Sequence, residues 1–271
     1  MAAFGVIGMG SIAQKHIVNL RQLHPDDKVY VVSASGNNAN KPSDADAVIT
    51  IQELISIQPQ YVIIASPAPL HVNTAIRLLS AGIPVLIEKP LSDDFQSCAE
   101  FQAINGGGLT TSAAVGYCLR FLPSTIVVKD YIDKGLLGKI YNVESHVGQY
   151  LPTWRKDKPF KDSVSAQKKL GGGALLELSH ELDYLFWFFG ELTLQHSWLR
   201  TTPELGLDVE DIANLVLTNP DDVYVTLHLD FVQKTTQRKC SIIGENGRLE
   251  WDLMSNSVNV FDVDGSTVLY S

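Results

Sequence analysis

Apolar residues before residue 120 gather in short runs, and segments with helical spacing separate those runs. The runs predict buried strands at Ala3–Ile7, Lys28–Ala34, Tyr61–Ala65, Ile83–Ile87 and Thr111–Tyr117. Spacings of three and four residues predict a helix that begins near Ile12 and further helices at Ile51–Ile57, Leu70–Ala81 and Asp93–Ala103. Strands that alternate with helices at this pitch indicate a parallel, doubly wound sheet, so the chain begins with an α/β domain.

The pattern changes near residue 120. Helices are predicted at Ser124–Asp133 and Ala174–Phe189, with a strand at Ile140–Val147 between them. Beyond Thr193, alternation predicts strands at Leu207–Thr218, Val223–Val232, Lys239–Ile243, Arg248–Leu253, Val258–Val263 and Thr267–Tyr270. Two of the turns, Asn246-Gly247 and Asp264-Gly265, have the residues that favour β-hairpins. We therefore expect a doubly wound domain over 1–120, then an α+β domain over 121–271 with an open, mainly antiparallel sheet that helices cover on one face.

The first predicted strand ends in a glycine turn that leads directly into the first helix. The turn reads Gly8-Met9-Gly10-Ser11-Ile12-Ala13, which fits the pattern G-x-G-x-x-G/A. In that pattern the first glycine allows a tight turn, the second lets the backbone approach a pyrophosphate, and the third small residue lets the helix pack closely. The helix N-terminus adds free N–H groups and a positive dipole end. The sequence therefore predicts a Rossmann domain whose dinucleotide site includes Gly8, Gly10, Ser11, Ile12 and Ala13.

Length, composition and charge narrow the class of protein. The chain has 271 residues, of which 45% are hydrophobic and 19% charged, as in a soluble globular protein with two domains of ordinary size. A net charge of -9 argues against a nucleic-acid surface, because phosphate binding needs clustered lysines and arginines. The three cysteines form no metal or redox motif, and no basic segment precedes the first apolar run. We expect a cytoplasmic protein with no nucleic-acid or membrane partner.

A charged tripeptide, Glu88-Lys89-Pro90, follows the strand predicted at Ile83–Ile87. In open α/β sheets, ligands bind beyond the carboxyl ends of the strands, so Lys89 is expected beside a bound nicotinamide ring. The alternative is a strand-end lysine whose ammonium group lies in solvent, but Pro90 restricts the backbone directly after Lys89. Other cofactor contacts are expected at Glu88 and at residues that follow neighbouring strands, namely Ser33, Ser35, Ser66, Pro67 and His71.

The helix predicted at Ala174–Phe189 has polar residues on an otherwise apolar segment. Glu177 and His180 stand three residues apart and share a face of a continuous helix, and Asp183 and Tyr184 follow within the same arc. A carboxylate beside a histidine fixes its tautomer and raises its basicity for proton transfer. The alternative is a surface histidine with an incidental acidic neighbour. His16, on the first helix, is interpreted as a structural residue that packs near the glycine turn.

The glycine turn, the Glu88-Lys89-Pro90 tripeptide and the run Gly171–Gly173 that leads into a helix with a carboxylate and a histidine resemble the Gfo/Idh/MocA oxidoreductase family. The resemblance covers essentially the whole chain. It implies NAD(P)-dependent oxidation or reduction of a hydroxyl or carbonyl group in a sugar, cyclitol or nucleotide-sugar. Lys89 matches the family's active-site lysine and His180 its catalytic histidine, while Glu177 stands near a helix carboxylate that is usually an Asp four residues before the histidine.

The resemblance also implies a homodimer or homotetramer formed through the open sheet, and a further strand and helix after the last hairpin. The expected cofactor is NAD or NADP, with no metal. The segment Ser33–Asn38 has neither an acid that repels a 2′-phosphate nor an arginine that binds one, so weak discrimination between them is expected. The expected substrate contacts are Lys89, Trp154, Arg155, Asp183 and Tyr184. Two other functions stay open: a catalytically idle NAD(P)-binding redox sensor, and reduction of an unsaturated or imine substrate.

Overall fold

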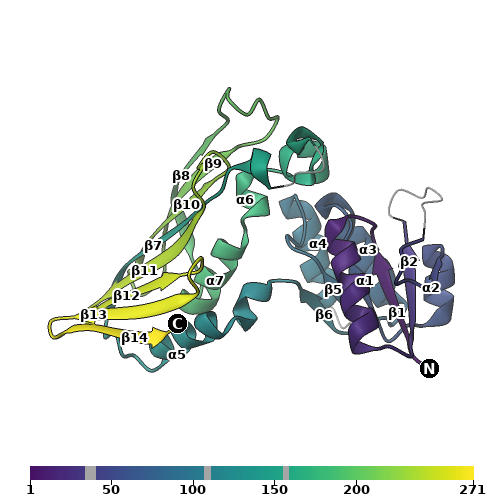
Figure 1. The fold of residues 1–271 in the computed structure, drawn as a ribbon, viewed down its shortest axis with the longest axis horizontal. Helices are drawn as coiled ribbons and strands as arrows, with labels where there is room; N and C mark the ends of the chain where they lie inside the picture. Colours follow the sequence, from purple (N-terminus) through teal and green to yellow (C-terminus); the bar gives the residue numbers. More distant parts are fainter. Residues whose placement is uncertain (34–40, 107–110, 155–158) are drawn as a thin grey trace. The chain divides into compact units, whose positions relative to one another are not determined.

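The computed structural model describes residues 1–33, 41–106, 111–154 and 159–271. They form two compact units (Figure 1). The first comprises Met1–Gly116 with Lys169–Gly171, and the second comprises Tyr117–Lys168 with Gly172–Ser271. We placed the domain boundary near residue 120; the first unit ends at Gly116 and takes in a short later segment as well.

The first unit is built on a six-stranded parallel sheet. Its elements are β1 (Ala3–Ile7), α1 (Ser11–Leu23), β2 (Lys28–Val32), β3 (Ala47–Val48), α2 (Ile51–Ile57), β4 (Tyr61–Ile64), α3 (His71–Ser80), β5 (Val85–Ile87), α4 (Phe95–Gly106) and β6 (Ala113–Val115). The strand order is β3-β2-β1-β4-β5-β6, and every pair is parallel. This is the strand order of the dinucleotide-binding fold. The expected doubly wound sheet is confirmed.

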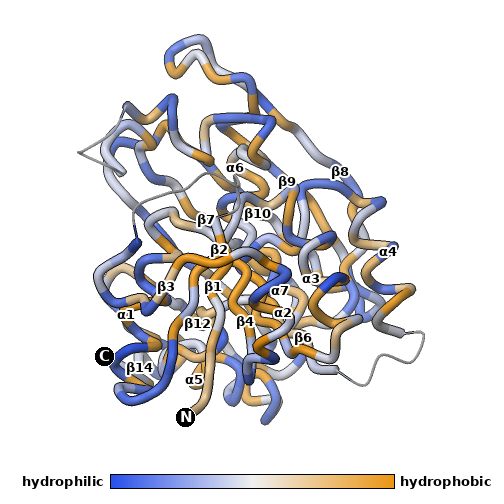
Figure 2. Tube along the Cα trace, turned by 90° about the vertical axis from the view of Figure 1, so that its right-hand side faces the viewer, coloured by the Kyte–Doolittle hydropathy of each residue, from blue (hydrophilic) through white to orange (hydrophobic). Residues whose placement is uncertain are grey.

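Two apolar clusters in this unit follow from the sequence of its strands, which are almost wholly apolar and appear orange in Figure 2. In one cluster, α1 packs Ala13, Ile17 and Leu20 with residues of β1 and β2. In the other, Leu54 of α2 and Leu78 of α3 pack with residues of β4 and β5. Strands with apolar residues at successive positions need cover on both faces, and the helices between them supply it.

The second unit is an eight-stranded sheet with helices on one face. Its elements are α5 (Pro123–Asp133), β7 (Ile140–Gly148), α6 (Ala174–Glu177), α7 (His180–Phe189), β8 (Thr193–Arg200), β9 (Ile212–Thr218), β10 (Tyr224–Asp230), β11 (Gln237–Gly244), β12 (Gly247–Asp252), β13 (Ser257–Asp262) and β14 (Gly265–Tyr270). The order is β14-β13-β12-β11-β7-β10-β9-β8. Every pair is antiparallel except β7 with β10. The expected open, mainly antiparallel sheet is confirmed.

Alternation along the strands sets the two faces of this sheet apart. In β10, Val225, Leu227 and Leu229 are buried, whereas Thr226 and His228 between them are partly exposed. The helices α5, α6 and α7 lie along the buried face (Figure 1). Among the described residues of this unit, no helix covers the other face, which we call the outer face. None of the described helices is long and apolar enough to cross a membrane.

Two expectations about the second unit are wrong. The helix expected over Ala174–Phe189 is interrupted at Leu178 and Ser179, so α6 and α7 are separate helices. The apolar spacing continues through the break, which is why the sequence pattern does not reveal it. The strand β8 was not expected. All eight of its residues are exposed, and its sequence lacks the regular alternation of apolar and polar residues that predicts a half-buried strand.

Candidate active site

The glycine turn between β1 and α1 has the geometry that the motif requires. Gly8 has a φ of +123°, and its N–H donates to the carbonyl oxygen of Val32 at 2.9 Å. A Cβ at this position would lie 2.3 Å from the carbonyl oxygen of Ala65, so only glycine fits. Ala13 is fully buried in the cluster between α1 and the sheet, which is the close packing expected of it.

The N-terminus of α1 is open for a ligand. Gly10 is the residue before the first turn, and no side chain caps that turn. A Cβ on Gly10 would meet no atom within 4 Å, and Gly10, Ser11 and Ile12 are all exposed. The N–H groups at a helix start attract anions when no side chain occupies them. These residues fit the pyrophosphate of a dinucleotide.

Glu88 and Lys89 follow β5 and are held by several hydrogen bonds. The N–H of Glu88 donates to the carbonyl oxygen of Ile64 at 2.9 Å, which continues the pairing of β5 with β4. The Nε2 atom of His16 lies 2.7 Å from Oε1 of Glu88, and Oε2 of Glu88 accepts from the N–H of Lys89 at 3.2 Å. The first helix is thus bonded directly to the tripeptide. The sequence assigned His16 a structural role near the glycine turn but did not identify Glu88 as its partner.

His71 holds the same segment from the other side. Its side chain is buried; Nδ1 lies 2.9 Å from the carbonyl oxygen of Pro90, and Nε2 lies 2.7 Å from that of Ser66. Both ring nitrogens therefore face backbone, and we no longer expect the ring to touch a cofactor. It joins the segment after β4 to the segment after β5, where the Lys89–Pro90 peptide bond is cis.

The segment after β4 also offers a polar group for a ligand. The hydroxyl of Ser66 is buried and has no hydrogen-bond partner among the described residues. A buried hydroxyl without a partner loses free energy, so such a group is expected to bond to something that the chain itself does not supply. Pro67 beside it is partly buried. Together with the open start of α1, this fits the nicotinamide dinucleotide that the motif predicts.

The polar residues of the second unit lie on two helices rather than one. Glu177 ends α6, and its Oε2 accepts a hydrogen bond from the hydroxyl of Ser165 at 3.0 Å. His180 begins α7, is partly exposed, and packs edge-on against the ring of Tyr117 with centroids 5.6 Å apart. Glu177 and His180 therefore do not share the face of one continuous helix, because the helix breaks between the two residues.

Asp183 forms an ion pair inside the second unit. Arg120 donates from Nε to Oδ2 at 2.8 Å and from Nη2 to Oδ1 at 2.6 Å, and this bond raises the pKa of Arg120. The Asp183 side chain is only 7% exposed, and the Arg120 guanidinium also lies over the ring of Trp187. Both carboxylate oxygens are occupied in this geometry, which ties α7 to the turn Cys118–Phe121.

Tyr184 is a core residue, which corrects its assignment as a substrate contact. Its side chain is fully buried, packs against Trp251 with centroids 5.0 Å apart, and bonds through its hydroxyl to that of Ser145 at 2.6 Å. Burial raises the pKa of Tyr184 well above its ordinary value, so the hydroxyl stays protonated. Its position follows from the apolar face of α7, not from the chemistry of the neighbouring histidine.

The remaining residues of the prediction are less constrained. Trp154 is partly buried and packs edge-on against Phe231, and its indole nitrogen has no hydrogen-bond partner among the described residues. Ser33 is partly buried at the end of β2. Arg155 and Ser35 lie outside the described residues.

Three side chains that contact the predicted site residues or the Gly171–Gly173 turn were not predicted from the sequence. Tyr117 and Arg120 contact His180 and Asp183, yet the sequence gave Tyr117 only as the end of a predicted strand and placed Arg120 in no element. Glu210 closes the Gly171–Gly173 turn, because its Oε1 accepts from the N–H of Leu175 at 2.9 Å. Gly173 has a φ of +114°, and a Cβ there would lie 2.4 Å from that oxygen, which explains the third glycine of the run. Only the glycine run itself gave a signal in the sequence.

Comparison with known proteins agrees with this geometry. Residues 2–105 match the model of the oxidoreductase family with an NAD-binding Rossmann fold, and residues 126–250 match that of the GFO/IDH/MocA C-terminal domain. Glucose-6-phosphate 3-dehydrogenase of Bacillus subtilis is 23% identical over 245 residues, which are 89% of this chain and 69% of that protein. Inositol 2-dehydrogenase 2 of Paenarthrobacter aurescens is 25% identical over 279 residues, covering 97% and 78%.

Solved structures share the fold. The structure of a levoglucosan dehydrogenase in complex with NADH and levoglucosan has a TM-score of 0.84 at 19% identity, covering all of this chain and 80% of that one. The WlbA dehydrogenase from Bordetella pertussis, in complex with NADH and UDP-GlcNAcA, has a TM-score of 0.78 at 20% identity and covers 93% and 73%. Fold, glycine turn and family models agree. The chain belongs to the Gfo/Idh/MocA family of NAD-dependent oxidoreductases.

Proposed function

We propose that the protein is a dehydrogenase that transfers a hydride between a nicotinamide cofactor and a CH–OH carbon of a sugar, cyclitol or nucleotide-sugar. One observation carries the proposal. At the carboxyl edge of the parallel sheet, His16 of α1 bonds to Glu88, so the helix that begins at the glycine turn is connected to the backbone of Lys89. A cofactor-binding turn and a cationic side chain held at the same sheet edge suit hydride transfer beside an alkoxide.

Bound NAD(P) supplies or accepts the hydride, and the residues of the chain manage charge and the proton. Lys89 stabilises the negative charge that develops on the substrate oxygen. His180 removes the hydroxyl proton in the oxidation direction and returns it in the reverse direction. The Ser165 hydroxyl holds the Glu177 carboxylate, and Glu177 is expected to orient His180 as the family resemblance implies, from the end of the preceding helix rather than from the same one. Asp183 acts indirectly, because its bond with Arg120 fixes the start of α7.

The substrate class rests on the relatives. They are named as dehydrogenases of glucose 6-phosphate, inositol and levoglucosan, all of which are polyhydroxylated rings. Trp154 and Arg155 are the residues from which we expect contact with such a ring or with a phosphate on it. The proposed substrate class is tested by following NADH formation through its absorbance at 340 nm with a panel of sugars, cyclitols and nucleotide-sugars. If no member of the panel is oxidised, the substrate class is wrong.

Cofactor binding has its own test in Gly10→Val. A Cβ at Gly10 meets no protein atom within 4 Å, so the fold is retained while the bulky side chain blocks the pyrophosphate. We expect NADH affinity by calorimetry to fall at least tenfold, about 1.4 kcal/mol. Gly106→Val is the matched control, since a Cβ on Gly106 also meets no atom within 4 Å and the position lies at the end of α4. Unchanged NADH binding by Gly10→Val would contradict the site.

The choice between NAD and NADP is expected to be weak. Ser33 at the end of β2 is no acid, and the next five residues, outside the described part of the chain, are uncharged as well. No carboxylate there repels a 2′-phosphate, and no arginine binds one. We predict that the two cofactors differ in kcat/KM by less than about a hundredfold, roughly 2.8 kcal/mol. A larger preference for NAD in steady-state kinetics would overturn this reasoning.

We also infer that the outer face of the eight-stranded sheet associates with a second copy of the chain. Trp198, Tyr224 and Ile243 are exposed there, with 61%, 45% and 39% of their surface accessible. Tyr224 of β10 and Ile243 of β11 alternate with buried residues along their strands, which places both on the outer face. Trp198 of β8 pairs with an outer-face residue of β9. Light scattering on the intact chain and on Trp198→Glu tests this; a monomer in the unaltered chain would refute it.

A further inference from the structure

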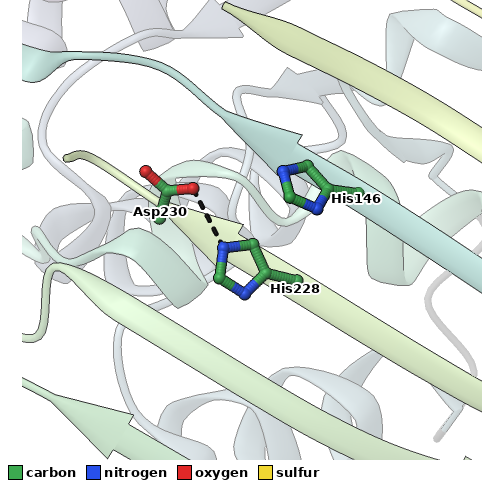
Figure 3. A group of neighbouring side chains, drawn as sticks. All are labelled: His146, His228 and Asp230. Atoms are coloured by element: carbon green, nitrogen blue, oxygen red, sulfur yellow. Dashed lines mark hydrogen bonds and ion pairs between the residues drawn. The ribbon is translucent and has the colours of Figure 1, made fainter. Parts of the chain in front are cut away.

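Three side chains with metal-binding atoms converge on the outer face of the second unit. His228 and Asp230 lie two residues apart on β10, and His146 lies directly beside His228 on the parallel neighbour β7. One ligand atom from each of the three lies within 4.8 Å of the others, and Figure 3 shows the side chains gathered above the two strands. The proposed catalytic residues Lys89, Glu177 and His180 do not belong to this group, which we call the strand triad.

The hydrogen bonds of His228 leave a position for a cation. Its Nδ1 lies 2.7 Å from Oδ1 of Asn214, and its Nε2 lies 2.9 Å from Oδ2 of Asp230. A neutral imidazole has one N–H, so it donates to only one of these two oxygens. If Nδ1–H donates to Asn214, the lone pair of Nε2 faces a carboxylate oxygen. A second proton, or a metal ion bound by both atoms, would then relieve the contact between the lone pair and the carboxylate, whereas the tautomer with its proton on Nε2 donates to Asp230 directly.

Asp230 is prepared as a ligand. Its side chain is only 2% exposed, and its Oδ1 accepts from the backbone N–H groups of Val232 and Gln233 at 2.8 and 2.6 Å. Those bonds leave Oδ2 directed at His228. The 2.9 Å between Oδ2 and Nε2 is a few tenths of an ångström shorter than the separation, about 3.3 Å, of two ligands that lie about 2.0–2.1 Å from a tetrahedral ion, so a small shift of the exposed imidazole would admit one.

His146 has a fixed tautomer that also suits a metal. Gln233 donates from Nε2 to the carbonyl oxygen of Thr235 at 2.7 Å, so its Oε1 is the atom that faces His146. Nε2 of His146 therefore carries the proton, at 2.9 Å from that oxygen, and Nδ1 has a lone pair. The two imidazole rings stack with centroids 4.5 Å apart, and a ligand atom of His146 lies within 4.8 Å of those of His228 and Asp230.

The surroundings match those of known metal ligands. A ligating histidine usually donates its other N–H to a carbonyl or carboxylate, and Nδ1 of His228, 2.7 Å from Oδ1 of Asn214, is placed to do so in the tautomer that leaves Nε2 free for an ion. Gly148 of β7 has no side chain and so leaves room beside the carboxylate, because a Cβ at this position would lie 2.3 Å from Oδ2 of Asp230. His228 is 32% exposed, which gives an ion a route to the triad.

We propose that His146, His228 and Asp230 bind a divalent transition-metal ion, with Zn²⁺ as the best match. Two imidazoles and one carboxylate are the donors of many zinc sites, whereas Mg²⁺ and Ca²⁺ prefer oxygen ligands. The expectation of no metal, which rested on cysteine spacing and on the family resemblance, said nothing about ligands brought together by a sheet. The site is structural or regulatory, because it lies on a different face from the helices that carry the proposed catalytic histidine.

The test is calorimetric titration of the untagged, chelator-treated chain with Zn²⁺. We expect one ion per chain, and no binding in His228→Ala or in His146→Ala. Asn214→Ala keeps all three ligands and loses only the outer hydrogen bond, so its affinity should fall by about 10- to 100-fold. His196→Ala is the matched control, because His196 is an exposed histidine of β8 in the same sheet, and it should bind as the unaltered chain does.

Two results would overturn the proposal. One is Zn²⁺ binding that His228→Ala leaves unchanged, which would place the ion elsewhere. The other is absence of binding by the unaltered chain, with nitrogen-15 NMR showing a proton on Nε2 of His228, which would mean that a proton bridges His228 and Asp230. Circular dichroism of each variant establishes that it is folded. Co²⁺ absorption in Asn214→Ala gives a second readout, since that variant keeps every ligand and is the least disruptive.

Discussion

The segment that carries Lys89 and the segment that carries His180 are held in place by different kinds of bond. Around Lys89, side chains bond mainly to backbone: His71 bridges two carbonyl oxygens, and Glu88 receives the N–H of Lys89. Around His180, side chains bond to side chains, as Arg120 does to Asp183. Hydrogen bonds to backbone groups hold the conformation of the loop around Lys89, whereas side-chain ion pairs hold the position of the whole helix that begins at His180.

A second ion pair of this kind has a fully buried carboxylate and a partly exposed guanidinium. Glu181 is fully buried on α7, and Arg238 of β11 donates to it from Nε at 2.6 Å and from Nη2 at 3.0 Å. With Arg120 and Asp183, this pair connects α7 to β11 and to the segment Cys118–Phe121. A helix held by buried charges should be costly to disturb. A loop held by backbone hydrogen bonds should cost less stability but should shift the lysine.

The largest effect on stability is expected from Glu181→Ala. It removes a fully buried carboxylate and leaves Arg238, 23% exposed, without that partner, so the free energy of unfolding should fall by up to about 3–5 kcal/mol in urea denaturation. Glu250→Ala is the matched control. It removes an Arg–Glu pair of the same sheet in which both side chains are 46% exposed, and such a pair contributes about 0–1 kcal/mol. Equal losses in the two variants would mean that burial does not distinguish these pairs.

A smaller loss of stability, with a loss of activity, is expected from His71→Ala. Removing the ring leaves one of the backbone oxygens of Ser66 and Pro90 without a donor, because a neutral imidazole donates a single N–H, and opens a buried space, which together cost about 1–3 kcal/mol. The backbone of Lys89 is then less constrained, so kcat should fall about tenfold or more while NADH affinity changes little. His71→Gln retains one amide donor and should recover part of the rate.

His24→Ala is the control for that prediction. The ring of His24 packs against Phe4 with centroids 4.2 Å apart in the same unit, but His24 lies after the last residue of α1, at the opposite end of that helix from the glycine turn. It should therefore lose stability without losing kcat. If both variants lower kcat equally, the bridge made by His71 has no particular effect on Lys89.

Whether a feature is local in sequence or joins distant residues explains which features could be predicted. The glycine turn, the helix Ile51–Ile57 and the charged tripeptide are local patterns, and the structure has them where the sequence predicted them. The ion pairs join residues 57 and 63 positions apart, and the bond from His16 to Glu88 spans 72 positions, so no local pattern predicts them. The break after Glu177 was hidden because Leu178 is buried, as a continuous helix would also bury it.

The strand triad is a second feature that could not be predicted from the sequence. His228 and Asp230 look like ordinary polar positions of an alternating strand, and only the pairing of β10 with β7 brings His146 beside them. That pairing is the one parallel pair described in the second sheet, and β7 and β10 are separated in sequence by two helices and two strands. Neighbours of this kind depend on topology, which hydrophobic periodicity does not determine.

The central claim is that Lys89 and His180 act on one substrate hydroxyl, and stopped-flow measurement of hydride transfer tests it most directly. With a substrate from the panel, Lys89→Met and His180→Ala should each slow the step by about two to four orders of magnitude, with NADH affinity little changed. Because the two residues handle one proton and its charge, the double variant should lose far less than the product of the two single losses. A double loss equal to that product, or a Lys89→Met variant that binds NADH poorly and transfers hydride normally, would contradict the account.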